Sequence, residues 1–259
     1  MWDPAEYSAF ADERSRPFFD LVARVPADQP DRVVDLGCGD GSLTATLAER
    51  WPAAVVSGVD SSPAMLAEAV RREVPGRLSF VPGDIAGWRP ERPVDVLISN
   101  AALHWVPDHP ALIGRLVSAV APGGWLAFQV PANFDSPSHL ELVALCGSPR
   151  WRDRLGAAGR RAIPVLESGR YLDLLASAGC TADVWETTYL HVLPGPDPVL
   201  AWVRGTALRP VLAALAGDPA AQADFLAEYG ERLRSVYPAA CYGTVLPFRR
   251  IFAVARRSR

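Results

Sequence analysis

Short apolar runs alternate with amphipathic segments along the first half of the chain. Runs of strand length cover residues 31–35, 55–60, 78–81, 94–99 and 125–130, and helical spacing covers residues 42–51, 63–73 and 110–120. Strands that alternate with helices at this spacing are typical of βαβ units and of a parallel sheet. The pattern therefore predicts an α/β protein with a Rossmann-like, doubly wound sheet.

The alternation becomes looser after residue 131. We predict helices over 138–146 and 168–178, an irregular arginine-rich stretch over 149–164, and strands over 183–192 and 248–255. Residues 199–236 are predicted to be largely helical, with breaks where proline and glycine interrupt the pattern. We interpret residues 1–259 as a single domain in which a helical insertion, about 193–245, precedes the last strand.

The first 25 residues are rich in aromatic side chains. Pro17 is predicted in the first turn of a helix that runs to about Arg24, because proline suits that position. Aromatic side chains before a first strand must pack on something. The sequence leaves two alternatives open, which are a helix packed on the sheet and a flap over a ligand.

Charge and composition exclude several function classes. The net charge of −3 disfavours a general nucleic-acid-binding protein. All 26 basic residues are arginine, which excludes a P-loop lysine and Schiff-base chemistry. The four scattered cysteines suggest neither disulfides nor a metal site. With no membrane segment and no secretory signal in the sequence, we expect a cytoplasmic protein with no membrane partner.

A glycine turn joins the first predicted strand to the first helix. Residues 35–41 have the pattern D-x-G-x-G-x-G, whereas a dinucleotide fingerprint has G-x-G-x-x-G. Asp40 would repel a pyrophosphate, so an NAD-dependent oxidoreductase is disfavoured. A cofactor with a positive sulfonium and an ammonium group tolerates such carboxylates, and Asp35 is placed to meet its positive end directly or through water.

Polar residues follow four successive strands, and these ends meet at one edge of a parallel sheet. Asp60 is expected to accept hydrogen bonds from ribose hydroxyls, with a helix-capping aspartate as the alternative. Asp84 is expected to accept from an adenine amine beside the backbone amide of Ile85, with a simple turn aspartate as the alternative. Asn100 is expected to contact a methionine moiety.

These motifs resemble those of class I S-adenosylmethionine-dependent methyltransferases. More narrowly, the chain resembles the trans-aconitate 2-methyltransferase family. The resemblance rests on residues 2–4, 7, 13–17, 35–39, 58–65, 100–105, 178–180, 185–189 and 205–210. One departure is Asp40, where relatives often carry proline.

The resemblance implies a seven-stranded sheet whose last strand is antiparallel, with the N-terminal segment and the insertion as a lid. It implies S-adenosyl-L-methionine (SAM) as cofactor and a carboxylate of trans-aconitate as methyl acceptor. The cofactor contacts expected are Asp35, Gly37, Cys38, Gly39, Asp60, Ser61, Met65, Asp84, Ile85 and Asn100. For a tricarboxylate, the substrate contacts expected are Tyr7, Arg14, Arg16, His104, Trp105, Tyr189, His191, Arg209, Arg249 and Arg250.

A carboxylate is already ionised at neutral pH, so no general base is required. His104 and Trp105 are then expected to orient the substrate. Two alternatives remain open: O-methylation of another small acid or natural product with His104 as base, and a catalytically silent SAM-binding protein. The sequence leaves open whether the protein is a monomer or a homodimer.

Overall fold

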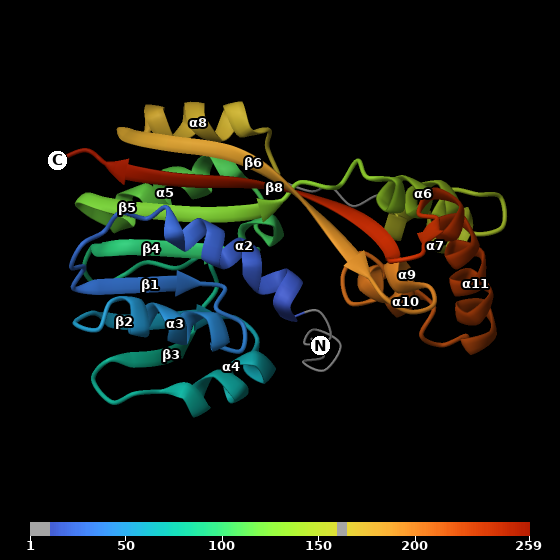
Figure 1. Cartoon of the computed structure of the whole chain (residues 1–259), viewed down its shortest axis with the longest axis horizontal. Helices are drawn as coiled ribbons and strands as arrows, with labels where there is room; N and C mark the ends of the chain where they lie inside the picture. Colours follow the sequence, from blue (N-terminus) through green and yellow to red (C-terminus); the bar gives the residue numbers. More distant parts are fainter. Residues whose placement is uncertain (1–10, 160–164) are drawn as a thin grey trace. The chain divides into compact units, whose positions relative to one another are not determined.

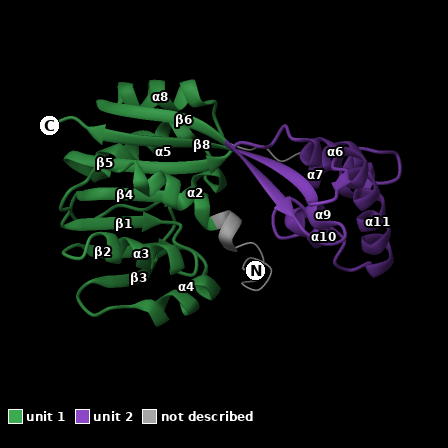
Figure 2. Ribbon diagram, in the orientation of Figure 1, with its two compact units in different colours: residues 1–131, 164–187, 250–259 green, residues 132–163, 188–249 purple. Residues whose placement is uncertain are grey.

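A computed structural model of the chain describes residues 11–159 and 165–259 (Figure 1). Its internal contacts divide the chain into two compact units (Figure 2). Unit 1 comprises residues 1–131, 164–187 and 250–259, and unit 2 comprises residues 132–163 and 188–249. Each unit is described in turn.

Within residues 11–159 and 165–259, the sheet has eight strands. They are β1 (Arg32–Leu36), β2 (Val55–Asp60), β3 (Leu78–Pro82), β4 (Val94–Asn100), β5 (Val120–Pro131), β6 (Cys180–Leu193), β7 (Ala239–Ala240) and β8 (Gly243–Arg257). Seven follow the order β3-β2-β1-β4-β5-β8-β6, and the two-residue β7 pairs with β8. The predicted α/β sheet is confirmed, including the last strand, β8, which runs antiparallel to β5. The short β7 was not predicted.

The order of the strands determines where a ligand site can form. From β1 the chain continues to β2 on one side, whereas β4 pairs with β1 on the other side. The carboxyl ends of β1 and β4 therefore lie next to each other, with Asp35 opposite Ile98. Such a reversal of strand order is the usual ligand position in open α/β sheets.

Helices cover the sheet of unit 1. They are α2 (Ala11–Ala23), α3 (Ser42–Arg50), α4 (Pro63–Ala69), α5 (His109–Ala119) and α8 (Ser168–Ser177), with 3₁₀ turns η1 (Val70–Arg72) and η2 (Leu103–Trp105). Helix α3 contacts β2, α4 contacts β3, and α5 contacts both β5 and α8. Leu36, Leu97 and Phe128 are fully buried in the core that results.

The N-terminal helix differs from the prediction. Pro17 lies inside α2, not in its first turn, although proline lacks the N–H that a helix interior uses. Buried Phe18 and Leu21 offset this cost, since burial of each such side chain contributes about 1.5–3 kcal/mol. Helix α2 contacts β5, so residues 11–23 pack on the sheet, as in the first of the two alternatives. The rest of the predicted flap, residues 1–10, lies outside the described residues.

Unit 2 is mainly helical. Its helices are α6 (Pro137–Cys146), α7 (Arg152–Gly159), α9 (Pro198–Arg204), α10 (Arg209–Ala214) and α11 (Pro219–Val236). Helix α7 contradicts the irregular stretch predicted over 149–164. Helices α6 and α7 contact α11 and α10, so residues 132–163 belong with the segment predicted as an insertion. The role of that segment as a lid stays a prediction.

Among the described residues, helix length and hydropathy together give no segment that could cross a membrane.

Candidate active site

The glycine turn between β1 and α3 has left-handed backbone at three positions. Gly37, Gly39 and Gly41 have φ of 80°, 58° and 75°. A Cβ at Gly37 would lie 2.2 Å from Cβ of Ala102, and one at Gly41 would lie 2.6 Å from the ring of Phe80. A Cβ at Gly39 would meet nothing within 4 Å. Of the three glycines, Gly39 is the one that leaves open space where a ligand can approach the backbone.

Asp60, at the end of β2, binds the glycine turn. Its Oδ2 accepts a 2.9 Å hydrogen bond from the amide of Gly39, and its Oδ1 accepts a 2.8 Å bond from the amide of Ser62. An ionised carboxylate offers about four lone-pair positions, so Asp60 can accept further bonds from hydroxyl groups. The hydroxyl of Ser62 caps α4 by accepting from the amide of Met65 at 3.5 Å. Asp60 therefore need not serve as the cap.

Asp35, at the end of β1, is a fully buried carboxyl group. Its Oδ2 accepts a 2.6 Å hydrogen bond from Oγ1 of Thr44 on α3. Its Oδ1 has no hydrogen-bond partner among the described residues. Burial, aided by the negative charge of Asp60 and opposed by the Thr44 bond, raises the pKa of Asp35 to about 6. A cationic donor at Oδ1 would satisfy the atom and favour the ionised form.

The other expected cofactor residues of this region lie around the turn. Burial and the nearby charges of Asp35 and Asp60 raise the pKa of the buried Cys38 thiol well above its usual range. Met65 on α4 is buried, whereas Ser61 is exposed.

Asp84 and Ile85 follow β3. Asp84 is exposed, and its Oδ1 accepts a 3.0 Å bond from the amide of Ala86, which forms a local turn. This matches the alternative of a turn aspartate and leaves lone pairs for a ligand amine. Ile85 packs toward the glycine turn, because its Cδ1 lies 3.5 Å from where a Cβ of Gly37 would stand.

Asn100, at the end of β4, begins a hydrogen-bonded row across three strands. Its Oδ1 accepts a 2.6 Å bond from Nε2 of Gln129 on β5, and Oε1 of Gln129 accepts a 3.1 Å bond from Arg250 on β8. Arg250 was expected to bind substrate, but it is buried and bonds within the sheet. The following residue, Ala101, has a φ of 51° and donates its amide to the carbonyl of Gln129.

His104 and Trp105 lie in the 3₁₀ turn after β4. Their rings are 4.7 Å apart at an angle of 42°, with His104 half-buried and Trp105 exposed. The turn is close in sequence to Asn100, so both rings lie near the carboxyl end of β4.

A buried pair that the sequence analysis missed holds this turn. Nε2 of His109 lies 2.9 Å from the carbonyl of Leu103, and its Nδ1 lies 2.5 Å from the hydroxyl of Tyr171 on α8. A carbonyl can only accept, so Nε2 carries the proton and Nδ1 accepts from Tyr171. Burial lowers the pKa of His109, which favours this neutral form. Aromatic residues spaced this far apart in sequence gave no signal that they would meet.

The substrate residues expected near the N-terminus are only partly described. Arg16 on α2 is exposed. Tyr7 and the side chain of Arg14 lie outside the described residues.

Tyr189 and His191 belong to unit 2 and are buried in an aromatic cluster. The ring of His191 stacks on Trp202 of α9 with centroids 4.9 Å apart, and it lies 5.9 Å from Phe248 of β8. Tyr189 lies nearly parallel to His191 at 6.1 Å. Both side chains are at most 5% exposed. Both rings were expected to bind substrate, but within unit 2 they pack in a buried aromatic cluster.

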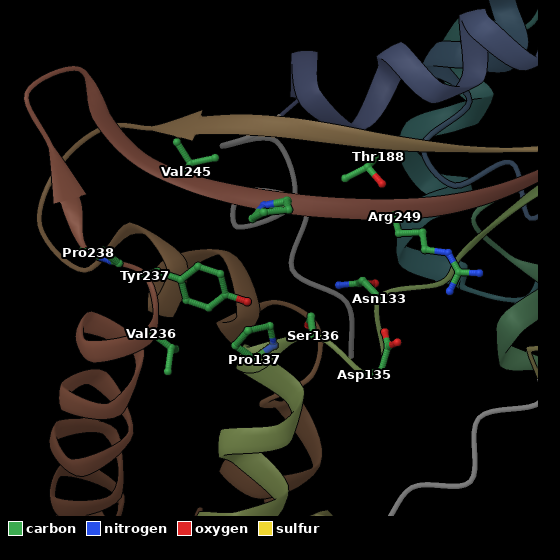
Figure 3. Close-up of a pocket in the computed structure, with 11 residues that line it drawn as sticks. Asn133, Asp135, Ser136, Pro137, Thr188, Val236, Tyr237, Pro238, Val245 and Arg249 are labelled. Carbon is green, nitrogen blue, oxygen red and sulfur yellow. The ribbon is translucent and has the colours of Figure 1, made fainter.

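Unit 2 also contains a pocket of about 480 Å³ (Figure 3). Its polar lining includes Asn133, Asp135 and Arg249 at one end, with Tyr237 and Val236 opposite. The hydroxyl of Tyr237 accepts a 3.1 Å bond from the amide of Ser138, which fixes its ring. Arg209, the other arginine expected in this unit, is half-buried and begins α10. The pocket lining thus contains one guanidinium group, Arg249, and one carboxylate, Asp135.

The predicted site residues therefore fall into two groups. All expected cofactor contacts belong to unit 1, and most gather around the ends of β1, β2 and β4. The expected substrate contacts are divided, with Arg16, His104, Trp105 and Arg250 in unit 1 and Tyr189, His191, Arg209 and Arg249 in unit 2. Within the described ranges, no group of three or more histidine, cysteine or acidic side chains is placed to hold a metal ion.

Comparison with known families gives one matching model. Residues 10–182 match a family described as a methyltransferase domain. This range contains the glycine turn and every residue expected to bind the cofactor. It ends before the residues of unit 2 that are expected to bind substrate.

Curated relatives match the chain over nearly its whole length. A trans-aconitate 2-methyltransferase from Streptomyces coelicolor is 54% identical over 263 residues, which cover 99% of this chain and 86% of the relative. One from Streptomyces avermitilis is 53% identical over 262 residues, covering 99% and 97%.

A solved structure supports the fold. A SAM-dependent methyltransferase from Thiobacillus denitrificans, in complex with S-adenosyl-L-homocysteine, matches with a TM-score of 0.55. It is 22% identical, and the match covers 99% of this chain and all of that one.

Proposed function

The chain belongs to the trans-aconitate 2-methyltransferase family of methyltransferases, and we propose that it transfers a methyl group from SAM to a carboxylate of trans-aconitate or of a closely related tricarboxylate. One observation carries the proposal. The relatives match this chain over 99% of its length, so the likeness continues beyond residue 182 into the segments with the expected substrate residues. A similarity that reflected only a shared cofactor-binding domain would end near residue 182.

The residues around the glycine turn fit a cofactor with a cationic end. Asp35 has a buried oxygen without a donor among the described residues, which suits an ammonium group. Asp60 has lone pairs left for ribose hydroxyls, and the open space at Gly39 admits the ligand to the backbone. When bound, SAM supplies a methyl carbon that is activated by its sulfonium.

The proposed reaction needs no general base. A carboxylic acid with a pKa near ~4 is already ionised at neutral pH. Transfer of the methyl group from the SAM sulfur to a carboxylate oxygen would give a monomethyl ester and S-adenosyl-L-homocysteine, and no proton would need to move. The protein contributes by orienting the carboxylate and by excluding water, which together can lower the barrier by about 7–11 kcal/mol.

Arginine side chains are the proposed partners of the tricarboxylate. Arg249 lines the pocket of unit 2 beside the amide of Asn133, and a guanidinium group can bind a carboxylate through two parallel hydrogen bonds. Arg209 and Arg16 remain proposed contacts, as do His104 and Trp105. Tyr7 and Arg14 remain predictions from the sequence. For Tyr189, His191 and Arg250, burial favours a role in shaping the site.

A lid formed by residues 193–245 and by the N-terminal segment is part of the same proposal. Methyl transfer from a sulfonium requires a dry site, and a lid would supply it. The single-domain interpretation and the cytoplasmic location stay predictions, and both a monomer and a homodimer remain possible.

The proposal is tested by incubation of the purified protein with methyl-labelled SAM and a panel of acceptors. The panel comprises trans-aconitate, cis-aconitate, citrate, isocitrate, monocarboxylates and phenols. We expect base-labile methyl esters from trans-aconitate in preference to the other acids. Transfer to phenols alone would overturn the carboxylate proposal in favour of O-methylation with a base. SAM binding without transfer to any acceptor would favour a silent binding protein.

A further inference from the structure

Three polar side chains form a row on one face of the sheet in unit 1. Asn100 lies opposite Gln129 in the parallel pairing of β4 with β5. In the antiparallel pairing of β5 with β8, Gln129 lies opposite Phe252, two residues from Arg250. Side chains at such positions point to the same face. Gln129 is fully buried and Arg250 nearly so, whereas Asn100 is half-buried at the end of the row.

The chemistry of arginine determines how both amides of the row are oriented. A guanidinium group can only donate, so the atom of Gln129 that bonds Arg250 must be the oxygen. The nitrogen of Gln129 then points toward Asn100 and must meet an acceptor there, which is Oδ1. Asn100 is left with its amide nitrogen as the outward group. Among the described residues, nothing accepts a hydrogen bond from that nitrogen.

We propose that Gln129 is a positioning residue, which with Arg250 fixes the amide of Asn100 so that its nitrogen donates to a ligand carboxylate at the end of β4. The inference rests on the proposed function, because that function supplies two such carboxylates. One belongs to the amino-acid end of the cofactor, and the other belongs to the acid substrate. Asn100 is the contact residue, and Gln129 acts through it.

Substitution of Gln129 by glutamate is expected to reverse the orientation of the Asn100 amide. The variant Gln129→Glu keeps an oxygen acceptor for Arg250 and adds a charge that pairs with it. Its second oxygen cannot donate to Oδ1 of Asn100, so the Asn100 amide rotates and donates inward. Its oxygen then faces the ligand carboxylate, where it repels instead of binding.

Substitution of Gln129 by methionine separates this role from a structural one. In Gln129→Met, Arg250 loses the hydrogen bond to Oε1 of Gln129, but the Asn100 amide is free to turn either way. A positioning role makes glutamate the more harmful substitution for carboxylate ligands, although glutamate is the better partner for Arg250. A structural role alone makes methionine the more harmful one.

Isothermal titration of the full-length variants shows which of the two substitutions weakens binding more. It also shows whether the cofactor or the substrate supplies the carboxylate that Asn100 binds. The two ligands titrated are S-adenosyl-L-homocysteine and 5′-methylthioadenosine, which has the same nucleoside but no amino-acid end. The KM for trans-aconitate is then measured from initial rates. If the cofactor supplies the carboxylate, Gln129→Glu weakens S-adenosyl-L-homocysteine about 10- to 100-fold and leaves methylthioadenosine within about twofold. If the substrate supplies it, KM for trans-aconitate rises by the same factor and both nucleosides are unaffected. Asn100→Asp, which also removes the outward donor, should show the same pattern.

The inference is overturned if Gln129→Glu binds every carboxylate ligand like the wild type, or if Gln129→Met is the weaker binder. It is also overturned if both nucleoside ligands weaken equally, because the site as a whole is then perturbed. Binding of methylthioadenosine shows that each variant is folded. Failure of the proposed function can be told apart from failure of this inference. If the protein does not turn over trans-aconitate, the difference in affinity between the two nucleoside ligands still tests the role of Gln129.

Discussion

The strand ends of unit 1 and the pocket of unit 2 differ in charge, because the strand ends carry carboxylates whereas the pocket lining carries both a carboxylate and a guanidinium group. In unit 1, Asp35 and Asp60 lie around the glycine turn and are held by amide and hydroxyl donors. In unit 2, Arg249 and Asp135 both line the pocket, and Arg150 pairs with Asp224 on the surface. The difference favours unit 1 for a cationic ligand, and it leaves Arg249 as the proposed partner of an anionic ligand in unit 2.

The largest effect is expected where a buried charge meets the cationic ligand. Folding raises the pKa of Asp35 from 3.8 to about 6. The contribution of this group to the free energy of unfolding is therefore fully present below pH 3.8, and it is lost as the pH rises from 3.8 through 6. The loss amounts to about 3 kcal/mol, at about 1.4 kcal/mol per pKa unit. Asp35→Asn should therefore stabilise the ligand-free protein at pH 8 by up to about 3 kcal/mol and weaken S-adenosyl-L-homocysteine about 10- to 100-fold.

Urea unfolding at pH 4, 6 and 8 and calorimetric binding measure the two effects. The matched control is Asp40→Asn in the same turn, where the carboxylate is half-exposed and lies 3.9 Å from the guanidinium group of Arg72. An unchanged pH dependence of stability in Asp35→Asn would contradict the assignment of this cost to Asp35.

The second effect tests the anionic half of the comparison. Arg249→Met should raise KM for trans-aconitate about 10- to 100-fold, because a charge-assisted hydrogen bond is lost. Binding of S-adenosyl-L-homocysteine should remain unchanged, since the cofactor residues belong to unit 1. Initial rates over a range of acid concentrations give KM.

Arg150→Met supplies the matched control in the same unit. Arg150 pairs on the surface with Asp224 and Glu228 and lies over the ring of Trp151, so its loss should leave KM unchanged and lower stability by at most about 2 kcal/mol. Equal rises in KM for both variants would mean that general charge, and not the pocket, attracts the substrate.

A smaller effect is expected in the support of the His104–Trp105 turn. Tyr171→Phe leaves Nδ1 of His109 without its donor and should cost about 1–3 kcal/mol in the free energy of unfolding. Urea unfolding at pH 8 measures this cost while His109 is neutral. Tyr242→Phe is the control, because Tyr242 is 66% exposed.

The same pair gives a pH dependence of opposite sign to that of Asp35. Burial lowers the pKa of His109, so the stability from its neutral ring is present above the ordinary value of 6.5 and is lost as the pH falls below it. His109→Gln should flatten this part of the stability curve between pH 7 and pH 5. If the curve keeps its slope, another group causes it.

The smallest effect is expected at His104. A general base contributes about 10²- to 10⁴-fold to rate, whereas an orienting ring should cost less than about tenfold in kcat when it is removed. His104→Ala with single-turnover kinetics measures this step. A loss above about 10³-fold with unchanged substrate affinity would show that the chemistry requires a base.

Local patterns predicted the parts of the fold that depend on near neighbours. The run from β1 through the glycine turn to β2 appears as expected, because hydrophobic period and glycine spacing act within a few residues. For the same reason, the sequence placed Asp35 and Asp60 at the ends of these two strands, and their role as cofactor contacts stays a prediction. Their exact partners, Thr44 and the amide of Gly39, depend on the folded turn.

Distant contacts explain what the sequence did not predict. Helix α7 contains two glycines and has little helical pattern, but Leu155 is fully buried and a Cβ at Gly159 would lie 2.6 Å from Cβ of Cys146. Packing on α6 therefore selects the helix against its local preference. The bond between Gln129 and Arg250 joins residues 121 apart, and strand register over that distance has no local signature.

The cysteine in the glycine turn has a consequence for the durability of the enzyme. A methyl donor is an electrophile, and the nucleophilic form of cysteine is the thiolate. Burial and three neighbouring carboxylates, those of Asp35, Asp60 and Asp40, keep Cys38 in the thiol form, because they raise its pKa far above neutral pH. The same negative charges that suit a cationic cofactor thus favour the less nucleophilic thiol form of Cys38 beside the proposed methyl donor.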